Sequence, residues 1–203
     1  MSKEKLYIFD TTLRDGAQTE GVDFSLEDKN KIASVLSDIG VDYIEGGWPG
    51  ANPVDTKFFS NQPKTGKTVF TAFGMTKKTG RSADNDPGLA SLINANTPAV
   101  CVVGKSWDFH VKVALGINNE ENLENIRETA KHLIKNKKEF IFDAEHFFDG
   151  YKANPDYALN CLKQAFDNGA RWIVLCDTNG GTLPNEVREI ISKVIKVIPG
   201  KNL

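Results

Sequence analysis

Residues 140–177, FIFDAEHFFDGYKANPDYALNCLKQAFDNGARWIVLCD, contain the pattern that decides the fold. Short apolar runs stand at 140–145 and 172–177, and both are rich in aromatic or β-branched residues and too short for a helix. A helix is predicted between them at 155–168, because proline suits the first turn and Gly169 provides a stop. Strand, helix and strand in this order predict a βαβ unit.

The same alternation extends toward both ends of the chain. Further strands are predicted at 6–10, 43–47, 68–73 and 99–103. Further helices are predicted at 25–39, 119–137 and 184–198. The first of these helices has Ser25 as its expected N-cap, Asp28 three residues later and Gly40 as its stop. Its apolar residues are Ile32, Val35, Leu36 and Ile39.

Six strand–helix units in strict alternation predict a parallel sheet covered by helices. A barrel and an open doubly wound sheet both satisfy this order, but no GxGxxG motif follows the first strand. We therefore predict an α/β fold, a (β/α)8 TIM barrel with six of its eight βα units in this chain. Eight units need about 250 residues. We interpret 1–203 as a partial catalytic barrel of strands 1 to 6, without strands 7 and 8 or a regulatory domain, and expect 201–203 to enter a seventh strand.

Composition narrows the class of protein. A formal net charge of −2 over 203 residues gives no basic surface that would favour nucleic acid. No stretch of about 18 apolar residues occurs, so we expect no membrane span. The three cysteines, Cys101, Cys161 and Cys176, are widely spaced in apolar contexts. This usage predicts reduced, buried thiols in a cytoplasmic protein.

Polar side chains follow several predicted strands where each strand ends. In parallel α/β folds these carboxyl ends meet on one face and form the active site. Charged residues also stand at the amino ends of the strands, so the polar residues could be there simply because strand ends are exposed to solvent. Three carboxylates nevertheless close apolar runs, where a charge is costly unless it is paired or binds a metal. These are Asp143, Glu145 and Asp177. Together with Arg14, they predict a site for a hard cation and an oxyanionic ligand.

Four segments carry a resemblance to a known family. FDTTLRDGAQ at 9–18 resembles the opening signature of the 2-isopropylmalate, homocitrate and citramalate synthases, a superfamily that includes 3-hydroxy-3-methylglutaryl-CoA (HMG-CoA) lyase. DYIEGGWPGANP at 42–53 and FDAEHFFDG at 142–150 are similar to the citramalate synthase subgroup. CDTNGG at 176–181 is similar to the family's motif on the sixth strand.

The resemblance implies an acyltransferase that condenses acetyl-CoA with a small 2-keto acid, here pyruvate, and releases CoA. It implies Asp15 as a ligand of a divalent metal (Zn, Mn or Mg). Arg14 would bind the keto acid and stabilise the enolising thioester, whereas Glu145 and Glu45 would take part in catalysis. Gln18 and Thr178 would bind the substrate. The enzyme would take part in isoleucine biosynthesis as a homodimer.

Three alternatives stay open beside this interpretation. The first is a sibling synthase for a larger keto acid, and the second is a lyase of the HMG-CoA lyase type. The third is an inactive domain that binds a partner or metabolite. The family's remaining metal ligands come from a His-x-His pair on strand seven, and 1–203 contains no such pair. We therefore expect these 203 residues by themselves to be inactive. A sheet of six strands would have bare edges, so we also expect the chain either to self-associate or to be accompanied by further residues.

Overall fold

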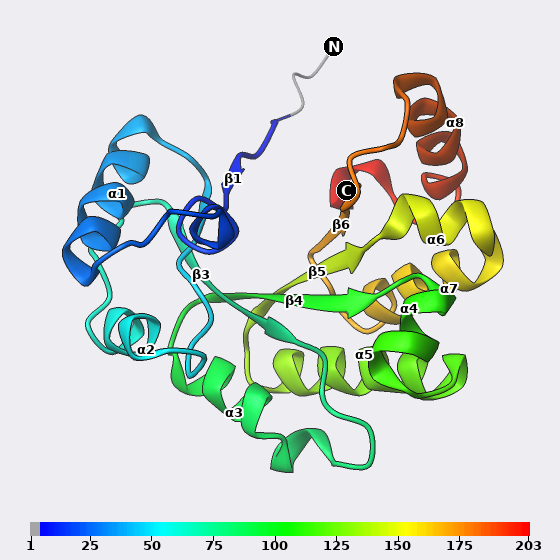
Figure 1. Cartoon of the computed structure of the whole chain (residues 1–203), viewed down its shortest axis with the longest axis horizontal. Coiled ribbons are helices and arrows are strands. Elements are labelled where there is room, and N and C mark those ends of the chain that lie inside the picture. Colours follow the sequence, from blue (N-terminus) through cyan, green and yellow to red (C-terminus); the bar gives the residue numbers. More distant parts are fainter. Residues whose placement is uncertain (1–4) are drawn as a thin grey trace. The chain divides into compact units, whose positions relative to one another are not determined.

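The computed structural model describes residues 5–203, and its six strands form one sheet in chain order. β1 pairs with β2, β2 with β3 and β5 with β6, all in parallel. The strands are β1 (Phe9–Asp10), β2 (Tyr43–Glu45), β3 (Val69–Met75), β4 (Ala99–Lys105), β5 (Glu139–Glu145) and β6 (Trp172–Leu175). Strand alternates with helix along the chain, which confirms the α/β class and the parallel pairing (Figure 1).

The α-helices are α1 (Leu26–Ile39), α2 (Pro53–Ser60), α3 (Pro87–Asn94), α4 (Asp108–His110), α5 (Asn119–Lys135), α6 (Phe147–Ala153), α7 (Pro155–Phe166) and α8 (Pro184–Val194). Short 3-10 helices cover η1 (Gly16–Gln18), η2 (Ala83–Asn85) and η4 (Gly200–Asn202), and η3 (Val111–Leu115) is a π-helix. No helix in the described range 5–203 has the length and apolarity needed to cross a bilayer.

The chain divides into two compact units, which are described separately below. Among the described residues, the first consists of 5–74 and 91–101, and the second of 75–90 and 102–203. The first unit therefore holds β1, β2, α1 and α2, and the second holds β5, β6 and the helices from α4 onward.

Packing in the first unit joins α1, α2 and the strands. α1 begins at a capping box, in which Ser25 accepts from the Asp28 amide and Asp28 accepts from the Ser25 amide. Gly40 ends the helix in the left-handed conformation, as predicted. Phe58 of α2 packs edge-to-face on Phe70 of β3, with ring centroids 5.3 Å apart, and both rings are buried.

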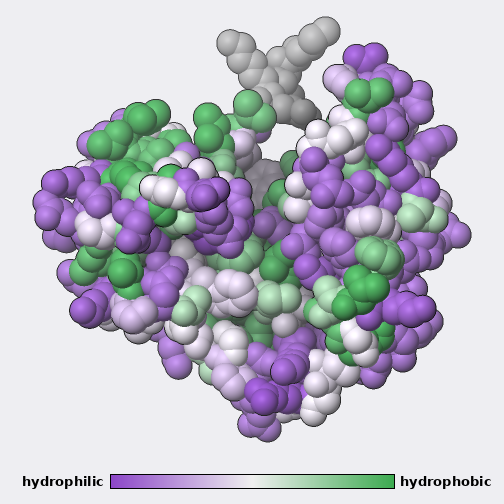
Figure 2. All heavy atoms as spheres, in the orientation of Figure 1, coloured by the Kyte–Doolittle hydropathy of each residue, from purple (hydrophilic) through white to green (hydrophobic). Residues whose placement is uncertain are grey.

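The buried face of α1 differs from the sequence expectation. Val35 is 55% and Ile39 72% exposed, whereas the buried residues of the helix are Lys29 and Ala33. Figure 2 shows apolar surface over α1 in the same region. The apolar residues of α1 do not mark its buried face, because the buried face is the one on which Lys29 forms the ion pair described below.

In the second unit, α5 and α7 pack on each other and on β5. α5 begins at a capping box of Asn118 and Glu121, and α7 begins with Pro155 after Asn154 caps the Tyr157 amide. The Asn122 side-chain amide donates to the buried Tyr157 hydroxyl over 2.7 Å. Burial raises the pKa of that hydroxyl above its usual value.

Several element boundaries differ from the prediction. β1 is shorter than 6–10, β3 and β4 extend two residues beyond 73 and 103, and α8 ends before 198. Residues 201–202 belong to a 3-10 helix, so the expected entry into a seventh strand is wrong for them. Helices α2, α3 and α6 were not delimited from the sequence because each is only seven or eight residues long.

No disulfide joins the cysteines in the described chain, and Cys101 and Cys161 are buried as predicted. Cys176 is only partly buried, which corrects the expectation for this residue. It follows β6 at the start of a surface loop.

We expect iodoacetamide to alkylate Cys176 first in the folded protein. Burial raises the pKa of the Cys161 thiol to about 12, so almost no thiolate is present there at neutral pH. Peptide mass spectrometry after timed alkylation measures the order, and unfolding in guanidinium should make all three thiols equally reactive. Equal rates at Cys161 and Cys176 in the folded protein would contradict the packing described for α7.

Candidate active site

The loop after β1 brings Arg14 between two carboxylates of the first unit. Arg14 Nε donates to Glu45 Oε2 over 2.6 Å, and its Nη1 donates to Asp15 Oδ1 over 3.0 Å. Glu45 is fully buried at the end of β2, whereas the Asp15 side chain is 63% exposed. Arg14 therefore anchors one buried and one accessible negative charge at neighbouring strand ends.

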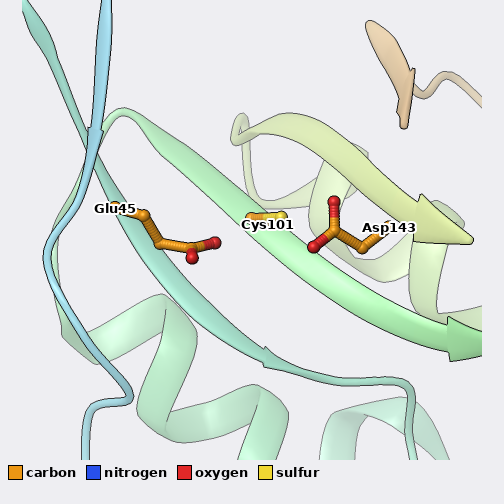
Figure 3. Close-up of side chains that lie close together, drawn as sticks. All are labelled: Glu45, Cys101 and Asp143. Atoms are coloured by element: carbon orange, nitrogen blue, oxygen red, sulfur yellow. The ribbon is translucent and has the colours of Figure 1, made fainter. Parts of the chain in front are cut away.

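Aromatic packing fixes the Arg14 guanidinium further. Its Cζ lies 3.9 Å from the centroid of the Phe73 ring on β3, a cation–π contact. Figure 3 shows the Glu45 carboxylate directed toward Cys101 of β4, and the Cys101 sulfur lies within 4.8 Å of a Glu45 oxygen. Asp143 of β5, drawn in the same figure, belongs to the second unit and is buried there.

A buried lysine, Lys29, bonds to the backbone next to both Arg14 and Glu45. Lys29 Nζ donates to the Leu13 carbonyl over 2.9 Å and to the Gly46 carbonyl over 3.0 Å, and it pairs with Asp55. These carbonyls belong to the residues directly before Arg14 and directly after Glu45. Because Lys29 is only 4% exposed, its ammonium is stable there only with these partners. This requirement explains why Lys29 faces inward on α1.

The loop between β2 and α2 is shaped by Asp55. Its Oδ2 accepts from the Trp48 amide over 2.9 Å, while Oδ1 takes the Lys29 ammonium. Gly47 has a φ of 144°, and a Cβ built there would lie 2.6 Å from Asp55 Oδ2. Position 47 therefore requires glycine, because a side chain would displace the carboxylate that holds Lys29.

A cavity of about 370 Å³ opens beside this network within the first unit. Arg14, Gln18, Lys29 and Trp48 are among the residues that line it. Gln18 stands at the end of η1, two residues after Gly16, and is exposed. Of the site residues predicted from the amino-terminal half, Arg14 and Gln18 line this cavity, whereas Asp15 and Glu45 are joined to Arg14 by hydrogen bonds.

The predicted residues Glu145 and Thr178 belong to the second unit. Glu145, the last residue of β5, pairs through Oε2 with the Lys105 ammonium at the end of β4. The Ser106 hydroxyl donates to the Glu145 carbonyl over 2.7 Å. Lys105 was not recognised from the sequence, because nothing local indicates that it faces a residue 40 positions later.

Thr178 is exposed in the loop after β6, and its Oγ1 accepts from the His146 amide over 2.9 Å. His146 Nδ1 lies 3.5 Å from Asp149 Oδ2, which also accepts from Asn179 Nδ2 over 2.9 Å. The His146 ring packs edge-to-face on His110, with centroids 4.3 Å apart. Glu145 and Thr178 are therefore linked through His146, which follows Glu145 in the chain and donates its amide to Thr178.

Two other polar side chains, those of Asp177 and His132, have structural roles. Asp177 accepts from the Thr182 amide and hydroxyl over 3.1 and 2.8 Å, and the amide bond lowers the pKa of the carboxyl below its usual value. It therefore closes the loop after β6. His132 of α5 lies with Nδ1 3.3 Å from Asp84 Oδ1, away from the strand ends.

The fold and the loop geometry define an α/β protein with charged groups at the carboxyl ends of its strands. The HMGL-like family model matches residues 5–203, and the chain belongs to this family. The HMG-CoA lyase of Brucella melitensis superposes with a TM-score of 0.81 at 18% identity, over 99% of this chain and 71% of that one. At this identity the likeness shows a shared fold.

Two curated relatives show which members of the family the chain resembles in sequence. The chain is 57% identical over 193 residues to an (R)-citramalate synthase of Aquifex aeolicus, which covers 94% of the chain and 37% of that relative. It is 33% identical over 195 residues to a 2-isopropylmalate synthase of Sediminispirochaeta smaragdinae, over 96% of the chain and 37% of the relative. The chain thus spans less than two fifths of either relative.

We expect Lys29→Met to destabilise the protein strongly, because it leaves the Asp55 charge buried without its cation. Breaking a buried pair from one side costs roughly 3–5 kcal/mol, which corresponds to a drop in Tm of roughly 10 °C for a chain of this size. Differential scanning fluorimetry measures it. Lys31→Met is the matched control, since Lys31 of the same helix is 70% exposed. Equal Tm values for both variants would show that the Lys29 network adds no stability.

Proposed function

We propose that the protein is a metal-dependent acyltransferase that condenses acetyl-CoA with pyruvate and releases CoA, as a citramalate synthase does. Identity of 57% to a curated (R)-citramalate synthase, over nearly the whole chain, is the observation that carries this proposal. The chain would form the amino-terminal part of a (β/α)8 barrel. We further propose that the enzyme acts in the cytoplasm as a homodimer, in the route to isoleucine.

Arg14 is the residue we assign to substrate binding and charge stabilisation. Two carboxylates and the Phe73 ring hold its guanidinium, so the group has little freedom to reorient when a substrate binds. A donor fixed in advance stabilises developing negative charge without a reorganisation cost. In the reaction proposed, that charge arises on the thioester oxygen when the acetyl methyl group loses a proton.

Asp15 is the residue we assign to the metal. Arg14, Asp15 and Glu45 together carry a formal charge of −1, so an incoming keto acid anion would meet net negative charge unless a cation were bound. The exposed Asp15 carboxylate offers the hard oxygen that a divalent cation prefers. When bound, the metal would polarise the keto group of the substrate. One carboxylate is too few for such a site, and the other ligands that the family resemblance implies are absent from 1–203.

In the second unit we assign Glu145 to acid–base catalysis and Thr178 to the carboxylate of the keto acid. The Glu145 carboxylate pairs with the Lys105 ammonium at the end of β4, and a carboxylate held in place in this way can accept a proton. Thr178 is exposed and carries a hydroxyl donor suited to a carboxylate. In the first unit we assign Gln18, which lines the cavity, to substrate binding. Glu45 is fully buried, and we assign it to catalysis through the Arg14 guanidinium that it holds.

A sibling synthase for a larger keto acid is the second candidate. The 33% identity to a 2-isopropylmalate synthase supports the shared condensation chemistry, but it is well below the identity to the citramalate synthase. Pocket size separates such substrates, because one methylene group changes the binding energy by only about 1–3 kcal/mol.

We expect the protein, expressed as its gene encodes it, to release CoA from acetyl-CoA fastest with pyruvate. A thiol reagent follows release in parallel reactions with pyruvate, 2-ketoisovalerate and 2-ketoglutarate, each with added Mg²⁺, Mn²⁺ or Zn²⁺. Preference for 2-ketoisovalerate or 2-ketoglutarate would favour the sibling synthases. Failure with all three keto acids would reject a synthase function.

We expect Arg14→Lys to reduce kcat by about 100-fold or more, because lysine cannot replace the planar fork that joins Glu45 and Asp15. The CoA-release assay measures this change. Arg127→Lys is the matched control, since the Arg127 side chain of α5 is 43% exposed and pairs with the exposed Glu124. An Arg14→Lys enzyme with normal kcat would remove Arg14 from the catalytic machinery.

A further inference from the structure

His146 adopts a backbone conformation that is rare for its residue type. Its φ of 53° and ψ of 34° lie in the left-handed region, between β5 and α6. Such a conformation costs a non-glycine residue free energy, so contacts around it must offset the cost. His146 directly follows Glu145, to which we assign acid–base catalysis.

The surroundings of the His146 ring supply those contacts. The side chain is 13% exposed and packs on His110, and the Trp107 ring centroid lies 5.9 Å away. Asp149 of α6 faces Nδ1 and is itself held by Asn179 of the loop after β6. The ring contacts come from two segments, 107–110 and α6, and a third segment, the loop after β6, holds Asp149 in place.

The backbone of His146 forms a hydrogen bond with Thr178, the residue that we assign to substrate binding. The His146 amide donates to Thr178 Oγ1 over 2.9 Å. A threonine hydroxyl has one proton to donate and two lone pairs to accept with. Because the His146 amide uses a lone pair, it restricts the rotation of the hydroxyl and leaves the proton for an acceptor elsewhere.

We propose that His146 is a positioning residue that presents the Thr178 hydroxyl to the carboxylate of a 2-oxo acid. This inference rests on the proposed function for the identity of the substrate. The backbone of His146 orients Thr178, and the ring, held by Asp149 and His110, keeps that backbone in the left-handed conformation. A purely structural role, as the N-cap of α6, would involve neither Thr178 nor the substrate.

A double-mutant cycle separates the two roles. We expect Thr178→Val and His146→Val each to raise the KM for pyruvate about tenfold or more, as when a hydrogen bond to a charged group is lost. The combined variant should resemble Thr178→Val alone, because His146 acts through Thr178. His146→Asn should keep KM within about threefold, since asparagine tolerates the left-handed conformation. Additive effects on KM, or a His146→Val enzyme with normal KM, would overturn the proposal.

Amide hydrogen exchange provides a test that needs no catalysis and no variant at position 146. By NMR, the His146 amide should exchange slowly in the wild-type protein and at least about tenfold faster in Thr178→Val. Thr182→Val is the matched control, because the Thr182 hydroxyl in the same loop donates to Asp177. Equal exchange in wild type and Thr178→Val would sink the inference. A wild-type protein that releases no CoA would instead reject the proposed function, and with it the 2-oxo acid named here.

Discussion

The burial of Glu45 is the constraint on which the first unit depends. A carboxylate with no solvent contact at a strand end needs a cation beside it, and Arg14 meets this need from the loop after β1. The position of Arg14 then determines where the Asp15 carboxylate can lie. One ion pair thus places the three residues to which we assign the chemistry of this unit.

Lys29 of α1 supports the same arrangement through the backbone. Its ammonium binds the carbonyls of Leu13 and Gly46, so it holds the backbone on both sides of the Arg14–Glu45 pair. The cost of burying a second cation is offset by Asp55, and Asp55 in turn orders the loop through Trp48. The charged groups of the site are thus held in place by a second buried ion pair, Lys29–Asp55.

The second unit uses the same principle at the end of β5. Glu145 pairs with Lys105 from the neighbouring strand end, and the next residue, His146, holds Thr178 in the loop after β6. Gly150 allows the close approach of α6, since a Cβ there would lie 2.4 Å from the Ser106 carbonyl oxygen. In both units, polar partners from separate segments define where each functional side chain points.

Local sequence determined the α/β alternation, the caps of α1, α5 and α7, and the polar strand ends. These features depend on residues within one or two turns of each other, so periodicity and capping rules detect them. Tertiary structure alone decided that α1 turns Lys29 inward and leaves Ile39 exposed, and that Glu145 meets Lys105. It also decided the left-handed turn at His146. Each of these outcomes depends on partners that lie far away in the sequence, and the cost of burying or straining a group is repaid only after those partners have come together.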